Sequence, residues 1–115
     1  MKRNIVREKS YAFAIEIVEL SQSLILQREF VLSRQILKSG TSIGANIREA
    51  EYAQSKADFI HKLCISLKEA NETEYWLDLL FDCKYIDEAT FQKRKISVSE
   101  LLRLLTRIIK TAKSK

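Results

Sequence analysis

The chain has no proline in 115 residues and only two glycines, Gly40 and Gly44, four positions apart. Turns recruit proline and glycine because these residues adopt or pre-set backbone angles that turns require. A β-rich fold of this length needs many turns, so their scarcity favours a few long helices joined by short polar connections. The length indicates one domain, residues 1–115, with a single core.

Apolar residues recur at helical spacing in four segments, over about residues 4–26, 33–52, 56–84 and 89–112. Short polar connections between such segments predict an all-α fold, an antiparallel up-down-up-down four-helix bundle.

Several local features refine this prediction. Val18 and Ile25 follow the apolar stripe of the first helix and are expected in the core. Residues 27–32 are expected to form a crossing in which Phe30 fills the core. Ser55 and Asp87 are suited to cap the third and fourth helices.

Residues 38–49 read KSGTSIGANIRE, which is compatible with a phosphate-binding loop, a linker or a helix face of small residues. A phosphate-binding loop needs four residues between its glycines and then Gly-Lys-Ser/Thr, whereas three separate Gly40 from Gly44 and Ala45 follows. Gly40 instead belongs to a four-three-four seam with Ile36, Ile43 and Ile47. The glycines are therefore predicted to lie inside a helix, at a cost of about 1 kcal/mol each, where another helix approaches closely.

Three polar residues, Ser42, Asn46 and Glu49, share one face of this predicted helix. One interpretation is a recognition site. The other is structural: the three side chains hydrogen-bond to a neighbouring helix or subunit and fix its register, as buried polar residues do in coiled coils. We favour the structural interpretation.

The stretch SGTSIGANIREAE, between RQILKS and KADFIHKLCISLKEANETEYWLDL, resembles the four helix bundle protein family. These small proteins are encoded by intervening sequences in bacterial 23S ribosomal RNA genes. The family's hallmark is small-Ser-Ile-x-x-Asn-Ile-x-Glu-Gly. Arg48 stands here where a small residue is usual, and Ala50 replaces the closing glycine. The hallmark is otherwise matched by Thr41, Ser42, Ile43, Asn46, Ile47 and Glu49.

The resemblance implies an antiparallel four-helix bundle that assembles into a ring-shaped homopentamer. Related accessory variability proteins of diversity-generating retroelements bind nucleic acid and a reverse transcriptase through a basic surface. No family property points to catalysis. The resemblance thus implies a non-enzymatic protein whose partners are further copies of itself, RNA or DNA, and another protein.

The net charge of +5 and pI near 9.3 permit an anionic partner. Five copies would carry about +25 and concentrate positive potential. No aromatic-rich stacking platform is evident, so contact with the nucleic-acid backbone is expected. The candidate nucleic-acid-binding residues are Arg103, Arg107, Lys110, Lys93, Arg94, Arg34, Lys38 and Arg48. A structural protein–protein adaptor with no nucleic-acid role is the alternative.

Features of an enzyme are weak in this sequence. His61 is the single histidine, so the repeated Glu-x-x-His pattern of di-iron bundles cannot form from Asp58 and His61 within one chain. A Cys64–His61 nucleophile pair lacks an orienting acid and oxyanion donors. We therefore expect no catalytic residues, metal or cofactor. A row of acids could hold a divalent ion but is better explained as a solvated face or an inter-subunit ion-pair strip; it comprises Glu74, Asp78 and Asp82.

Cys64 and Cys83 lie in apolar patterns and are expected to be buried, reduced thiols of a cytoplasmic protein. No uninterrupted apolar stretch reaches about 18 residues, so no membrane span is predicted.

Overall fold

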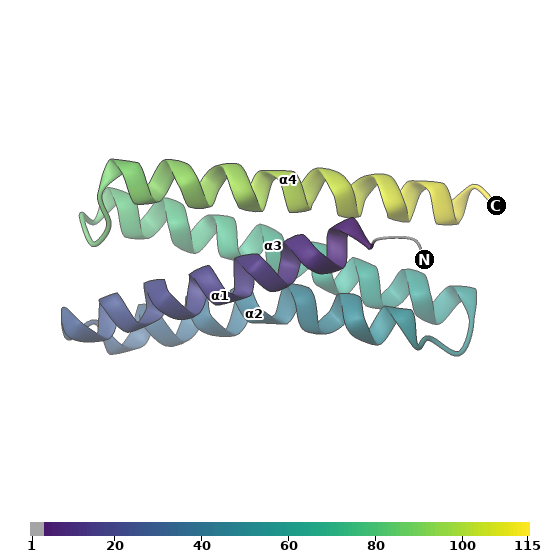
Figure 1. The fold of residues 1–115 in the computed structure, drawn as a ribbon, viewed down its shortest axis with the longest axis horizontal. Coiled ribbons are helices and arrows are strands. Elements are labelled where there is room, and N and C mark those ends of the chain that lie inside the picture. The colour runs from purple at the N-terminus through teal and green to yellow at the C-terminus, as the bar shows by residue number, and fades with distance from the viewer. Residues whose placement is uncertain (1–3) are drawn as a thin grey trace.

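The computed structural model describes residues 4–115, which form four antiparallel helices in an up-down-up-down bundle (Figure 1). Consecutive helices pack side by side, whereas α1 touches α4 much less and the diagonal pair α2 and α4 does not meet. The described residues include no strand. The predicted fold class is therefore confirmed. The helices are α1 (Ile5–Leu26), α2 (Phe30–Glu51), α3 (Lys56–Asp82) and α4 (Glu88–Lys113).

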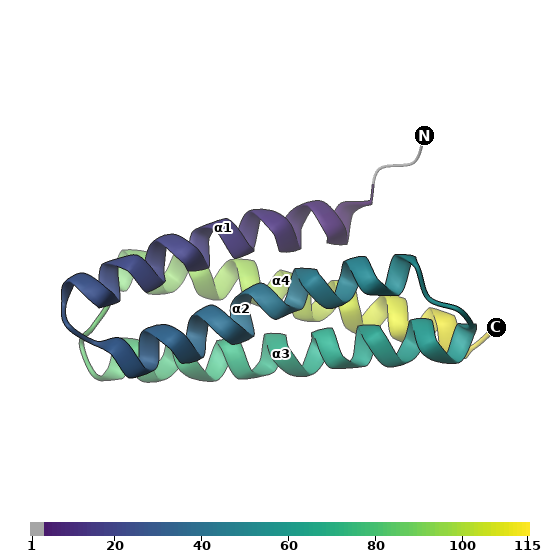
Figure 2. The same ribbon diagram turned by 90° about the horizontal axis from the view of Figure 1, so that it is seen from below.

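The bundle is 46 Å long and 25 by 21 Å across. The α1–α2 and α3–α4 turns lie at one end, and the α2–α3 connection lies at the other end with the start of α1 and the end of α4 (Figures 1 and 2). Ser55 and Asp87 cap their helices as predicted: the Ser55 hydroxyl accepts the N–H of Asp58, and the Asp87 carboxylate accepts that of Thr90.

The second helix begins three residues earlier than predicted because Glu29 caps it. The carboxylate of Glu29 accepts hydrogen bonds from the N–H groups of Leu32 at 2.8 Å and Val31 at 2.9 Å. The bond from Leu32 also lowers the pKa of Glu29, which keeps a negative charge at the positive end of α2. Phe30 is consequently the first helical residue and 51% exposed, so the prediction that it fills the core was wrong.

The core runs along the bundle axis and draws on every helix. Two residues predicted for it are instead exposed, Val18 at 38% and Ile25 at 46%, because α1 carries apolar side chains on a second, uncovered face. Fully or almost fully buried side chains include Phe13, Ile17, Leu24, Ile36, Ile43, Ile47, Leu77, Leu80, Val98, Leu101 and Leu105.

The glycines of α2 mark its closest approach to α1. A Cβ at Gly40 would lie 2.7 Å from Cγ2 and 2.9 Å from Cγ1 of the fully buried Ile17. A Cβ at Gly44 would lie 3.2 Å from the hydroxyl oxygen of Ser10. At Gly40 the space that a side chain would need is therefore filled by Ile17 of α1, whereas at Gly44 there is almost enough room for a methyl group.

Buried hydroxyl groups join α2 to its neighbours. On the α3 side, the Ser66 hydroxyl donates to the carbonyl of Ile43 at 2.8 Å, and the hydroxyls of Thr73 and Ser39 are bonded at 2.9 Å. On the α1 side, the Ser21 hydroxyl donates to the carbonyl of Ser33 at 3.2 Å. Small side chains let the backbones approach, and each of these buried hydroxyls finds a carbonyl or another hydroxyl on the facing helix.

The two glycines should respond differently to alanine. Gly40→Ala should lower the free energy of unfolding by about 1–2 kcal/mol, because overpacking against Ile17 exceeds the gain of about 1 kcal/mol in helix propensity. Gly44→Ala, the matched control, should change it by less than about 1 kcal/mol, since the Ser10 hydroxyl can rotate away. Urea unfolding followed by circular dichroism measures both; equal effects would contradict the packing described for Gly40.

The bond between α2 and α3 can be tested at Thr73. Thr73→Val keeps the shape of the side chain but leaves the buried Ser39 hydroxyl without its partner on α3, so we expect a loss of about 1–3 kcal/mol in unfolding free energy. Thr106→Val is the control. The Thr73 hydroxyl also lies 2.8 Å from the carbonyl of Glu69 in its own helix, and Thr106 makes the equivalent bond to the carbonyl of Leu102, but on an exposed surface with no partner on another helix among residues 4–115. Equal stability of the two variants in urea would argue against a structural role for this contact.

Candidate nucleic-acid interface

Three of the predicted cations form a continuous stripe on α4. Arg103, Arg107 and Lys110 are exposed on the side of α4 that faces away from the core. Together with Leu102 and Thr106 they line a shallow hollow. Among the described residues, no carboxylate forms an ion pair with any of the three. We call Arg103, Arg107 and Lys110 the α4 stripe.

The basic cluster at the start of α4 does not extend this stripe. Lys93 is exposed, but the side chain of Arg94 is only 15% exposed and lies 3.4 Å from the carboxylate of Glu16 on α1. Arg94 therefore serves the packing of α4 on α1, which the sequence could not show because Glu16 is far away in the chain.

Lys95, next to Arg94, is also engaged within the bundle. Its ammonium group lies 2.7 Å from Asp78 and 3.4 Å from Glu74 on α3. Partial burial disfavours its charge, but the hydrogen bond to Asp78 and the charge of Glu74 outweigh burial and raise the pKa of Lys95. Two members of the predicted acidic row thus form an ion-paired strip between α3 and α4, while Asp82 is exposed.

The remaining predicted cations lie on the outer side of α2. Arg34, Lys38 and Arg48 are all exposed, and the guanidinium carbon of Arg48 lies 5.1 Å from the ring centre of Tyr11 on α1. Because α2 and α4 are diagonal in the bundle, this group and the α4 stripe lie on opposite sides of the molecule. One protomer therefore presents two separate basic surfaces.

The three polar residues on one face of α2, Ser42, Asn46 and Glu49, make mostly local bonds. The Ser42 hydroxyl donates to the carbonyl of Lys38 at 2.6 Å, and the Asn46 amide donates to the carbonyl of Ser42 at 2.9 Å, both within α2. Glu49 alone of the three reaches another helix, accepting from Lys62 of α3 at 2.9 Å. Within this protomer, the buried hydroxyls of Ser66 and Thr73 bond α3 to α2, whereas Ser42 and Asn46 bond within α2; their proposed contact with a neighbouring subunit stays a prediction.

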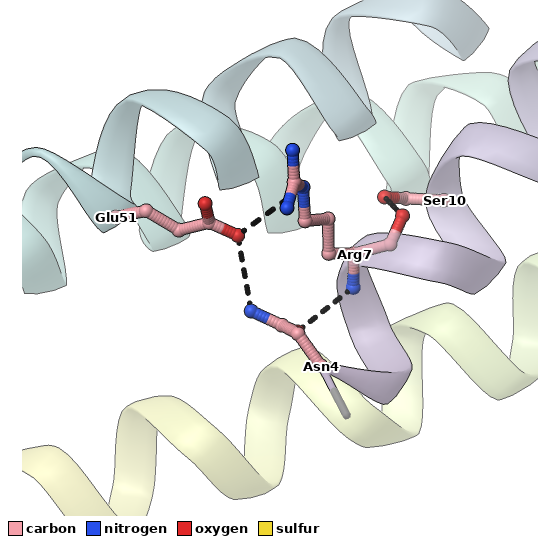
Figure 3. Close-up of polar contacts among 4 residues, drawn as sticks. All are labelled: Asn4, Arg7, Ser10 and Glu51. Carbon is pink, nitrogen blue, oxygen red and sulfur yellow. Dashed lines mark hydrogen bonds and ion pairs between the residues drawn. The ribbon is translucent and has the colours of Figure 1, made fainter. Parts of the chain in front are cut away.

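A polar cluster fixes the start of α1 to the end of α2 (Figure 3). One carboxylate oxygen of Glu51 accepts from the Asn4 amide at 3.0 Å and lies 3.6 Å from Nε of Arg7. Asn4 also caps α1 by accepting the N–H of Arg7 at 3.0 Å. The sequence could not show this cluster because Asn4 and Glu51 are 47 residues apart in the chain.

The residues considered for metal binding or nucleophilic catalysis are not arranged for either role. His61 is exposed and Cys64 half-buried, and no group of three or more His, Cys, Asp or Glu side chains within residues 4–115 is placed to hold a metal ion. Both thiols are free, but Cys83 is exposed, so the prediction that both are buried was wrong. None of the four helices is long and apolar enough to cross a membrane.

The fold and its surfaces define a small all-helical bundle with basic outer faces. Residues 2–107 match the family model described as the 23S rRNA-intervening sequence protein, and the chain belongs to this family.

A crystal structure of a protein with unknown function from the S23 ribosomal protein family of Bacteroides thetaiotaomicron is similar throughout. The two chains are 57% identical, with a TM-score of 0.90 over 91% of this chain and 98% of that one. A comparison with curated proteins gave no match. The family suggested by the Thr41–Ala50 hallmark is thereby confirmed.

Proposed function

We propose that this protein is a non-enzymatic, homo-oligomeric bundle that binds the backbone of RNA or DNA through the α4 stripe, as a cytoplasmic accessory to a ribonucleoprotein. The observation that carries the proposal is the stripe itself: three exposed cations along one helix face, with no carboxylate paired to them among the described residues. Elsewhere on the molecule, cations such as Arg94 and Lys95 are held by acids within the bundle.

The spacing of the stripe suits a row of phosphates. Arg103, Arg107 and Lys110 lie four and three residues apart, so successive charges are separated by about one helical turn, or roughly 5.4 Å. Successive phosphates of a nucleic-acid strand are separated by a similar distance, so each cation can face a different one. Backbone contacts of this kind release counterions and give binding that weakens as salt rises.

Exposed apolar side chains support self-association. They gather at the α1–α2 turn and on the adjoining outer surface of α1. In a single copy these side chains face water, and a second copy could cover them. Exposed clusters of this kind mark interaction surfaces. We call the cluster the turn patch; it comprises Ile15 (48% exposed), Val18 (38%), Ile25 (46%), Leu26 (86%), Phe30 (51%) and Val31 (58%).

Self-association would strengthen nucleic-acid binding. Each added copy contributes a further charge of +5 and a further α4 stripe. The family resemblance implies a homopentamer, in which several stripes would contact one strand. Once one stripe is bound, the others are held close to the same strand at a high effective concentration, which raises the overall affinity.

Charge reversal on the stripe tests the binding proposal. Arg103→Glu with Arg107→Glu should weaken binding to labelled RNA at least tenfold in low salt and reduce the slope of log affinity against log salt by about 1.5–2, since two phosphate contacts are lost. Lys68→Glu with Lys84→Glu makes the same charge change at exposed positions on α3 and the turn that follows it, and should have a much smaller effect.

Fluorescence anisotropy across a salt series measures both variants. Equal weakening by the two pairs would show that net charge, not the α4 stripe, governs binding. Failure of the unaltered protein to bind RNA or DNA in low salt would overturn the proposal and leave the adaptor function.

The turn patch predicts the mass in solution. The unaltered protein should have a mass several times that of the 13.4 kDa chain by light scattering. Ile25→Glu with Phe30→Glu should reduce it to a single chain, because buried carboxylates would oppose association. Ile96→Glu is the control, since Ile96 is 67% exposed on α4 outside the patch. A 13.4 kDa mass for the unaltered protein would contradict self-association.

A further inference from the structure

We propose that Tyr11, Arg48 and Tyr52 form a binding site for unpaired bases of single-stranded nucleic acid. The site lies where the first half of α1 meets the end of α2; Tyr11 is one helical turn from Ile15 of the turn patch, and the site shares no residue with the α4 stripe. The inference rests on the proposed nucleic-acid function and adds to it a contact with bases, which the α4 stripe does not provide.

The fold brings two exposed tyrosines to either side of one arginine. Arg48 lines two adjoining hollows, one shared with Tyr11 and the other with Tyr52. Tyr11 is 55% exposed and Tyr52, at the C-cap of α2, is 85% exposed. An aromatic ring that is 85% exposed contributes little to the core, so packing does not account for Tyr52.

The hollow beside Tyr11 is open because its floor is built from small residues. Gly44 and Ala45 of α2 face Ser10 and Ala14 of α1 across this floor. Gly44 has no side chain, so this part of the floor stays open. A flat base entering the hollow can therefore reach the Tyr11 ring.

The hollow beside Tyr11 favours an anionic ligand, because Arg7 and Arg48 line it and no carboxylate does. Three carboxylates lie nearby: Glu51 is shared by Asn4 and Arg7 (Figure 3), Glu49 accepts from Lys62, and Asp58, which lines the hollow beside Tyr52, accepts the backbone N–H of Gln54. Arg48 has no carboxylate partner among the described residues, and its guanidinium carbon lies 5.1 Å from the centre of the Tyr11 ring. Its guanidinium group is free to bind a phosphate while still covering an aromatic ring.

This combination of aromatic faces and a guanidinium group is the usual chemistry of single-strand binding, in which bases stack on rings and the backbone follows positive charge. The sequence concealed it because Tyr11 and Tyr52 lie in different helices. A base-paired strand keeps its bases stacked on one another, so the site selects unpaired nucleotides.

The test separates bases from backbone. Anisotropy is measured with labelled oligoadenylate and with an abasic ribose-phosphate chain of the same length. The unaltered protein should prefer oligoadenylate by about fivefold or more, the effect of stacking one base. Tyr11→Leu with Tyr52→Leu should remove this preference and leave binding of the abasic chain unchanged. Tyr75→Leu, at a tyrosine 59% exposed on α3, should retain the preference.

Equal binding of the two ligands by the unaltered protein would overturn this inference while leaving the α4 stripe proposal standing. A preference that survives in the double variant would also overturn it. If the unaltered protein binds neither ligand, the proposed function is overturned as well. Tyr52→Leu alone changes only an exposed side chain, so a reduced preference in this folded variant supports the site if the double variant is unstable.

Discussion

The close contact of α2 with its two neighbours is the constraint on which the rest of the structure depends. Gly40 lets α1 approach until Ile17 occupies the place of a side chain, and Ser39 lets α3 approach with Thr73 as its hydrogen-bond partner. Glycine and serine weaken an isolated helix, so α2 must be held by these contacts rather than by its own propensity. Two of its sides are thereby fixed, and its outer side, with Arg34 and Arg48, remains free for other molecules.

The position of α1 follows from this contact. It packs tightly on α2 but meets α4 less closely, partly through the ion pairs Lys9–Glu100 and Glu16–Arg94. Such pairs near the surface add little stability, so burial against α2 dominates the docking of α1. A helix anchored mainly on one side keeps its other apolar side chains exposed, which explains why α1 carries both the turn patch and one ring of the tyrosine site.

The sequence was sufficient to predict those features of the fold that depend on local patterns of residues. Apolar spacing identified four helices, Ser55 and Asp87 identified two of their starts, and the Gly40 seam identified a buried helix face. The errors arose at residues whose burial or pairing depends on another helix. Val18 and Ile25 have helical spacing, but spacing cannot tell which of two apolar faces is covered. Arg94 belonged to a basic cluster in the sequence, yet Glu16 from another helix neutralises it. The tyrosine site likewise required the pairing of α1 with α2.

The diagonal placement of α2 and α4 limits how a nucleic acid can use this protein. In the proposed function, a strand lying along the α4 stripe of one copy runs on the opposite side from Arg48 of α2, because α2 and α4 are diagonal in the bundle. Reaching both surfaces of a single copy would require the strand to bend around a bundle 21–25 Å across, against the repulsion between its own phosphates. A strand that passes from the stripe of one copy to the tyrosines of another avoids this bend. If the two proposals hold together, binding of bases and binding of backbone should cooperate between copies, and self-association would be part of recognition rather than an independent property.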